Sequence, residues 1–234
     1  MTKHELSQVS QIVREQWDHL RAWIEDNVDV HDPRPSVLEG WTVAELVAHL
    51  ARAHRVIPMA TADEAGLPAQ SLAEYLGGYA GDAASIAEGT REQAREIAED
   101  PLAALDRAAE QAWAALEAFG PADRVVIAKR GPIMLSDLVV TRGVEWVVHA
   151  DDLARSVGAT KPPVTRAALD LVAQALLDIV VTRGGWSLEV ADALLWVRLA
   201  AGRQPYDVDE LARALSPTYT ADAVPDLGTV LPLL

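Results

Sequence analysis

The 234-residue sequence contains no cysteine. This excludes disulfides, thiolate-ligated zinc and a cysteine nucleophile, so any thiol chemistry needs a thiol from outside the chain. Phenylalanine occurs once, at Phe119, and β-branched runs are short, whereas alanine and leucine are abundant. This composition favours helices over strands.

Long apolar runs are also missing. None reaches the roughly 18 residues that a membrane-spanning helix needs, and the first residues lack the basic-then-apolar order of a signal peptide. We therefore expect a cytoplasmic protein that has no membrane partner.

Positive charge is scarce, with 20 Lys plus Arg against 35 Asp plus Glu and a net charge of -15. Such a surface repels a phosphate backbone, so we expect no nucleic-acid partner. The length suits one large domain or two unequal ones, and Lys161-Pro162-Pro163 is the best candidate linker. We predict a helical, metal-binding bundle over residues 1–160 and a small C-terminal region over 161–234.

Apolar residues recur at three- and four-residue steps, which predicts a series of helices. The second begins at Thr42, which forms a capping box with Glu45, and Ser136 is the predicted cap of a later helix. Gly77-Gly78 is a weak point, and Gly89 a possible break, in the segment 71–98. Arg124 to Leu135 predicts a short hairpin or an extended crossover. The predicted helices are 4–27, 42–60, 71–98, 101–119, 137–157, 165–182, 192–200 and 208–215.

The 137–157 helix has a narrow polar stripe that includes Arg142, Glu145, His149 and Asp152, and most of its remaining surface is apolar. This predicts a largely buried helix with a polar seam. Glu145 and His149 lie one turn apart and can bind one cation; a carboxylate with an imidazole suits Zn²⁺ or another first-row divalent ion. Asp152 could orient the His149 imidazole. The alternative is that the seam faces water, as many Glu-x-x-x-His pairs do.

Two histidines in the 42–60 helix are candidates for a third ligand. His49 lies at the edge of the apolar stripe and His54 lies nearer its middle, so the helical wheel favours His54 as the inward-pointing group. The pattern alone leaves both open. The run from Thr90 to Asp100 alternates charge in the manner of a solvated helix face and needs no function.

Two segments resemble the second-helix and fourth-helix motifs of the mycothiol-dependent maleylpyruvate isomerase N-terminal domain family. They are residues 40–50, with the sequence GWTVAELVAHL, and residues 142–154, with the sequence RGVEWVVHADDLA. The family belongs to the DinB-like metalloprotein superfamily. The resemblance implies a mainly α fold, with a DinB-like up-and-down four-helix bundle over roughly residues 5–158.

The end of the chain resembles relatives with a sterol-carrier-like α+β domain, through residues 192–203 and Leu231-Pro232-Leu233-Leu234. Only residues 184–191 occupy the place of those relatives' strands. We therefore expect a shortened, small and mostly helical α+β C-terminal region. Arg203 could bind a substrate carboxylate there, although a surface or structural role is favoured.

The resemblance implies that His49, Glu145 and His149 hold the metal, which selects His49 over His54 as a ligand. Asp152, Arg142 and His54 are then candidates for the surrounding shell. Three protein ligands leave a coordination position open, as in catalytic zinc sites. The cosubstrate that the resemblance implies is mycothiol, a small-molecule thiol of actinobacteria, which would become a nucleophile on the metal.

The predicted function is therefore a metal-dependent, mycothiol-using transferase or isomerase that acts on a small electrophile. The alternative is a non-enzymatic bundle that binds a metal or a small ligand. A homodimer is compatible with either hypothesis.

Overall fold

The computed structural model describes residues 5–219 and 223–234. It is mainly helical, which confirms the predicted fold class. The described residues divide into two compact units, one ending at Thr165 and the other beginning at Arg166. The predicted boundary was residue 160, and the independence of the two regions as domains stays a prediction.

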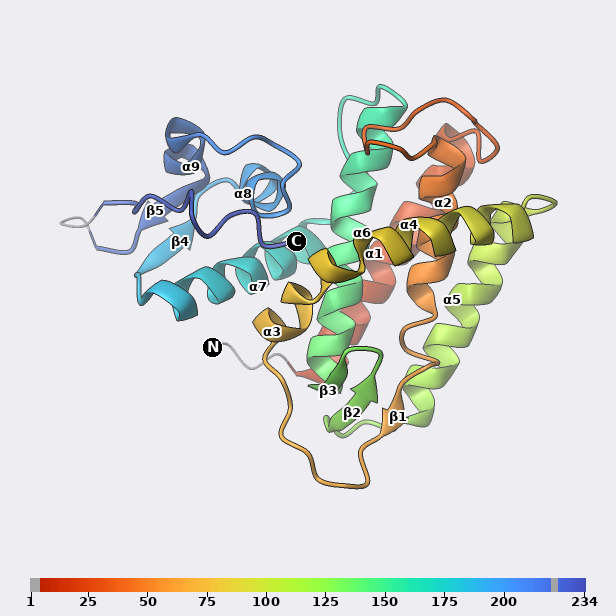
Figure 1. Ribbon diagram of the computed structural model, residues 1–234, viewed down its shortest axis with the longest axis horizontal. Helices are drawn as coiled ribbons and strands as arrows, with labels where there is room; N and C mark the ends of the chain where they lie inside the picture. Colours follow the sequence, from red (N-terminus) through yellow and green to blue (C-terminus); the bar gives the residue numbers. More distant parts are fainter. Residues whose placement is uncertain (1–4, 220–222) are drawn as a thin grey trace. The chain divides into compact units, whose positions relative to one another are not determined.

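Four long helices form the bundle of the first unit (Figure 1). Helix α1 packs along α6, and α2 packs against both α5 and α6. Their apolar faces meet in a core that includes the fully buried Leu20, Leu46, Leu50 and Leu105. The helices are α1 (Leu6–Asn27), α2 (Val43–His54), α5 (Pro101–Ala118) and α6 (Leu135–Ser156).

The start of α2 is the predicted capping box. The Thr42 hydroxyl accepts from the Glu45 backbone N–H at 3.1 Å, and the Glu45 carboxylate accepts from the Thr42 N–H at 2.8 Å. The helix ends at His54 rather than at residue 60. Pro58 gives the reason, because it has no N–H to bond the His54 carbonyl.

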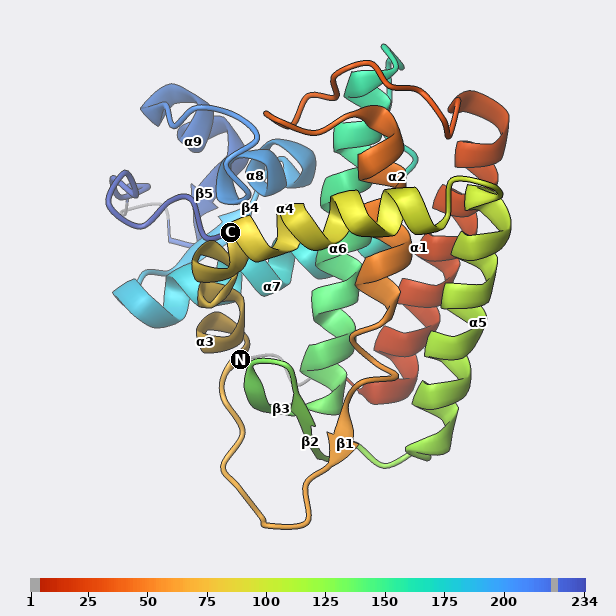
Figure 2. The same cartoon turned by 45° about the vertical axis from the view of Figure 1, so that its right-hand side comes forward.

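Helices α3 (Leu72–Gly77) and α4 (Tyr79–Glu96) are separated at Gly78, the predicted weak point. The possible break at Gly89 was wrong, because α4 runs through it. A Cβ at Gly89 would lie 2.8 Å from Nε of Arg52, so the glycine makes room for a side chain from α2. Helix α4 crosses over α2 in both views (Figures 1 and 2).

The predicted hairpin is present as β2 (Val125–Ala128) and β3 (Gly131–Met134), which pair antiparallel. The short strand β1 (Thr61–Ala62), which the sequence pattern did not predict, adds to β2. Helix α6 follows β3 directly and begins at Leu135, so the prediction that Ser136 caps it was wrong. The Ser136 backbone N–H and hydroxyl instead donate to the Asp123 carboxylate.

The second unit contains three helices and a two-stranded antiparallel sheet, in keeping with the small, mostly helical region expected. Trp196 is fully buried, and its indole N–H donates to the Ala173 carbonyl at 2.9 Å. The elements are α7 (Arg166–Gly184), β4 (Leu188–Val190), α8 (Ala193–Ala200), α9 (Val208–Ala214) and β5 (Leu215–Pro217).

Across the residues described, every helix is too short or too polar to cross a bilayer.

Candidate metal centre

The polar seam of α6 lies inside the bundle. The Glu145 and His149 side chains are 11% and 10% exposed, and Asp152 is fully buried. The alternative that the seam faces water was therefore wrong. A carboxylate and an imidazole that are removed from water need partners, because an unpaired buried charge is costly.

The partner comes from α2. His49 Nε2 lies 3.1 Å from Glu145 Oε2, and His149 Nε2 lies 3.3 Å from the same oxygen. The ligand atoms of all three residues fall within 4.8 Å of one another. The structure therefore brings together the three predicted metal ligands from two helices.

These separations fit a shared metal ion. Zinc bonds to nitrogen and oxygen of 2.0–2.1 Å in a tetrahedral site place two ligand atoms about 3.3 Å apart. Both Nε2–Oε2 separations are close to that value. The donor set, two imidazoles and one carboxylate, also suits a divalent first-row ion with one position left open.

The other nitrogen of each imidazole has a hydrogen-bond partner. His149 Nδ1 lies 2.9 Å from Asp152 Oδ2, and His49 Nδ1 lies 3.3 Å from Thr90 Oγ1. The Asp152 carboxylate can only accept, so with a metal bound it favours the His149 tautomer whose Nε2 lone pair is free, and the Thr90 hydroxyl can do the same for His49. Asp152 therefore lies where the sequence predicted, beside His149.

The electrostatics keep the carboxylate ionised. Burial by itself would raise the pKa of Glu145, yet hydrogen bonds to His149 and His49 hold that pKa well below its usual value. Burial lowers the pKa of His49, which favours the neutral imidazole. Burial acts the same way on His149, but hydrogen bonds to Asp152 and Glu145 outweigh it and raise the pKa of His149. A negative oxygen thus faces two imidazoles, as a cation site requires.

Arg142 lies beside this cluster and is 2% exposed. Its guanidinium donates to the Ala53 carbonyl at 2.9 Å and to the Tyr79 hydroxyl at 2.8 Å. Its Nη2 lies 3.8 Å from Glu145 Oε1, whereas both histidines face the other carboxylate oxygen, Oε2. Arg142 therefore links α2, α4 and α6 around the carboxylate.

His54 occupies a different environment. Its ring packs against Trp17 and Trp146 at centroid distances of 4.2 and 4.3 Å, and Trp113 lies beyond at 5.9 Å. Burial, together with the charge of Arg142, lowers the pKa of His54 to about 3. The structure thus places His54 in a tryptophan cage, so a role beside the metal stays a prediction.

Thr90 is the neighbour that sequence reasoning missed. The charge pattern from Thr90 to Asp100 predicts a solvated face, and this prediction is wrong for two residues, because Thr90 is fully buried and Gln93 is 5% exposed. A signal was present, because Ile86, Thr90, Gln93 and Ile97 follow one another at steps of four, three and four residues. That spacing places the four residues on one face of a helix. Because Thr90 and Gln93 are polar, the face does not show as an apolar stripe in the sequence.

A cavity of about 280 Å³ opens beside the cluster, and both His49 and Glu145 line it. Five cationic side chains also line it, although the chain as a whole carries a net charge of -15. They are Arg52, Arg55, Lys129, Arg130 and Arg142. Of the described residues that line the cavity, Glu145 alone is acidic, so the cavity is locally positive.

The cations differ in how far they are already paired. Lys129 and Arg130 share Asp82, at 3.5 and 2.7 Å. Within residues 5–219 and 223–234, Arg52 has no carboxylate at ion-pair distance, and the buried Nε–H of Arg130 has no acceptor. Arg52 is therefore free to bind an anion in the cavity, whereas the Arg130 Nε–H is shielded from it.

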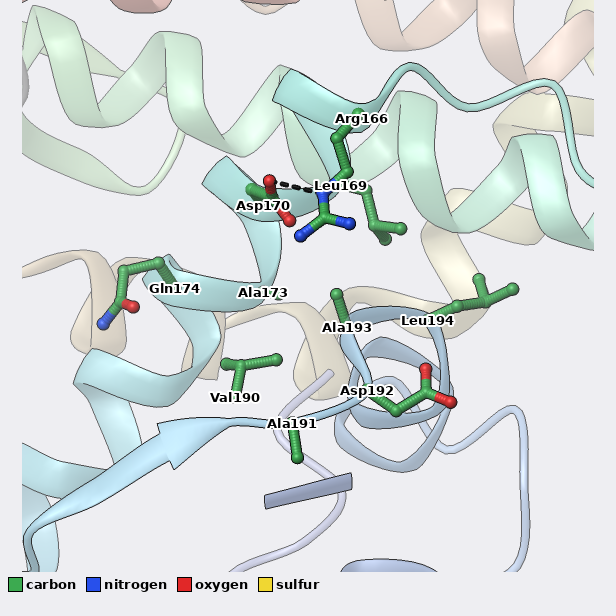
Figure 3. Close-up of a pocket in the computed structure, with 10 residues that line it drawn as sticks. All are labelled: Arg166, Leu169, Asp170, Ala173, Gln174, Val190, Ala191, Asp192, Ala193 and Leu194. Carbon is green, nitrogen blue, oxygen red and sulfur yellow. Dashed lines mark hydrogen bonds and ion pairs between the residues drawn. The ribbon is translucent and has the colours of Figure 1, made fainter. Parts of the chain in front are cut away.

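The second unit holds another cavity, of about 400 Å³, between the start of α7 and the start of α8 (Figure 3). Its polar groups are already used. Arg166 pairs with Asp170 at 2.6 Å, and Asp192 accepts from the Leu195 N–H as the cap of α8. It therefore offers less to a ligand than the cavity beside the histidines.

The chain matches the model of the mycothiol maleylpyruvate isomerase N-terminal domain family over residues 13–154. The match spans more than half of the chain and includes His49, Glu145 and His149. The chain belongs to this family. A search of curated proteins finds no match.

A crystal structure described as that of the mycothiol-dependent maleylpyruvate isomerase shares the fold of this family member. The TM-score is 0.59 at 17% sequence identity, over 87% of this chain and 93% of that chain. Because the bundle ends at Thr165, a match of this extent reaches into the second unit.

Proposed function

We propose that this protein is a metal-dependent, mycothiol-using transferase or isomerase acting on a small, negatively charged electrophile. The convergence of His49, Glu145 and His149 at the wall of a cationic cavity carries the proposal. The family to which the chain belongs is named for a mycothiol-dependent isomerase. The absence of cysteine is consistent with a nucleophilic sulfur that arrives with a cosubstrate.

The chain's own residues would prepare the site. A divalent ion, zinc by preference, would supply Lewis acidity that lowers the pKa of a thiol at the open position. His49, Glu145 and His149 would hold it, while Thr90 and Asp152 fix the two imidazole rings. Burial raises the pKa of Tyr79 to about 12, so its hydroxyl stays protonated. Because its oxygen accepts from Arg142, the Tyr79 proton is available to a ligand in the cavity.

The positive charge of the cavity favours an electrophile that carries a negative charge. The Arg52 guanidinium can donate to a carboxylate in the cavity, and a charge-assisted hydrogen bond of this kind contributes about 1.5–3 kcal/mol. A neutral electrophile would leave Arg52 without a carboxylate partner. The proposed substrate class is therefore a small electrophile that carries a carboxylate.

Zinc-loaded protein is expected to accelerate the addition of mycothiol to monomethyl fumarate, an anionic electrophile. In that reaction sulfur bonds to one alkene carbon and the thiol proton goes to the other. Loss of free thiol measures the rate, which should fall to the uncatalysed value after chelation and recover when zinc is restored. Metal and thiol binding without turnover across a panel of carboxylate electrophiles would instead favour the alternative, a non-enzymatic binding protein.

Arg52→Gln is expected to raise KM for monomethyl fumarate about 10-fold to 100-fold, the range of one charge-assisted hydrogen bond. With the neutral dimethyl fumarate, KM should change little. Arg91→Gln is the matched control, since it removes the same charge from an exposed α4 residue outside the cavity. An equal effect of Arg52→Gln on both electrophiles would contradict a role in recognising charge.

A further inference from the structure

A second cavity of the first unit, about 380 Å³, lies over α2 between α4 and α5. We call it the α4–α5 groove. Apolar residues form about half of it, including Ala51, Ala104 and Ala108, and the others carry amide or charged side chains. A surface that mixes small apolar residues with amides and charges suits a ligand bearing hydroxyl and amide groups.

Two residues, Arg55 and Met59, line both this groove and the cavity beside the histidines. They form the divider between the two spaces. Met59 is 67% exposed, and the Arg55–Glu96 ion pair spans 3.6 Å between side chains that are both more than half exposed. Such an ion pair contributes only about 0–1 kcal/mol to stability. The Arg55 and Met59 side chains can therefore move aside at a small cost in free energy.

Gln93 supplies an observation that points to a ligand. The residue is 5% exposed and lines the groove, and its Oε1 is buried without a donor among the residues described. A buried acceptor that lacks a donor costs about 1–3 kcal/mol. If the Gln93 amide rotates toward the groove, a hydroxyl or amide N–H of a ligand there would supply the missing hydrogen bond.

The spacing along α2 sets the length of such a ligand. His49 and Arg55 are six residues apart, which corresponds to about 9 Å along a helix. A molecule that fills the groove and also reaches the metal cluster must extend over roughly that distance. Mycothiol has this form, because it joins N-acetylcysteine to a hydroxyl-rich amino sugar and inositol.

We propose that the α4–α5 groove binds the sugar body of the cosubstrate thiol, whose sulfur reaches the metal cluster past Arg55 and Met59. This inference rests on the proposed function. It assigns Gln93 to the recognition of a ligand hydroxyl or amide. It also explains why a polar residue occupies the buried face of α4.

Calorimetric binding to zinc-loaded protein tests the inference with two thiols, mycothiol and N-acetylcysteine, which lacks the sugar body. Gln93→Leu should weaken mycothiol binding about fivefold, the effect of one neutral hydrogen bond, and leave N-acetylcysteine unchanged. Ala108→Phe, which fills the groove, should weaken mycothiol binding more than 10-fold by the same measure. Ala114→Phe is the control, since Ala114 is an exposed residue of the same helix outside the groove.

The outcomes separate the two proposals. Weaker binding of mycothiol alone in both groove variants supports the inference. Equal losses for both thiols, or unchanged mycothiol binding in Ala108→Phe, overturn the groove while the proposed function stands. If zinc-loaded wild-type protein binds neither thiol, the proposed function fails and the groove assignment fails with it.

Discussion

His149→Ala is expected to abolish stoichiometric zinc binding at pH 7. The His149 imidazole lies 3.3 Å from the Glu145 oxygen and is held by Asp152, so alanine removes one of the three proposed ligands and its contacts with both carboxylates. Loss of an outer partner alone costs about 10-fold to 100-fold in affinity, and loss of a ligand should exceed that range. Metal analysis of purified protein and competition with a chelator measure the effect.

His49→Ala should have a similar effect, although His49 is on another helix. His19→Ala is the control, because His19 is exposed on α1. One zinc per chain retained in both His49→Ala and His149→Ala would refute the ligand set. Retention in only one of them would show that the ion is held by fewer residues than proposed.

Arg142→Met is expected to lower the free energy of unfolding of the metal-free protein by about 3–5 kcal/mol, the cost of removing one partner from a buried charge pair. Methionine keeps much of the volume but leaves the Ala53 carbonyl and the Tyr79 hydroxyl without their donor. It also removes the cation that faces the Glu145 carboxylate. Denaturant unfolding in the presence of a chelator measures the change.

The control for this experiment is Arg91→Met, on α4 of the same unit. The Arg91 side chain is 50% exposed and lies 3.9 Å from Glu45, so the loss of unfolding free energy should stay below about 1 kcal/mol. Equal destabilisation by the two variants would mean that Arg142 acts through packing alone. A small loss in Arg142→Met would show that water replaces the guanidinium.

Sequence and structure agree best where the interaction is local. The capping box at Thr42 and the pairing of β2 with β3 depend on residues close together in the chain, so their patterns are visible in the sequence. Glu145 and His149 share a face because four residues make about one helical turn. By contrast, helical periodicity alone does not specify where a helix begins or ends. The end of α2 depends on Pro58, and the start of α6 depends on the direct connection from β3.

By itself, the sequence determined that the protein is mainly helical, that it has no thiol of its own and that one helix carries a carboxylate and an imidazole on a single stripe. Helical periodicity sets directions within one helix, but it does not say which helices face each other. Only the tertiary structure decided that His49 meets that stripe, that Thr90 lies behind His49 and that five cations line one cavity of an acidic protein. The physical reason is that these contacts join residues far apart in the chain, through packing that no local pattern encodes.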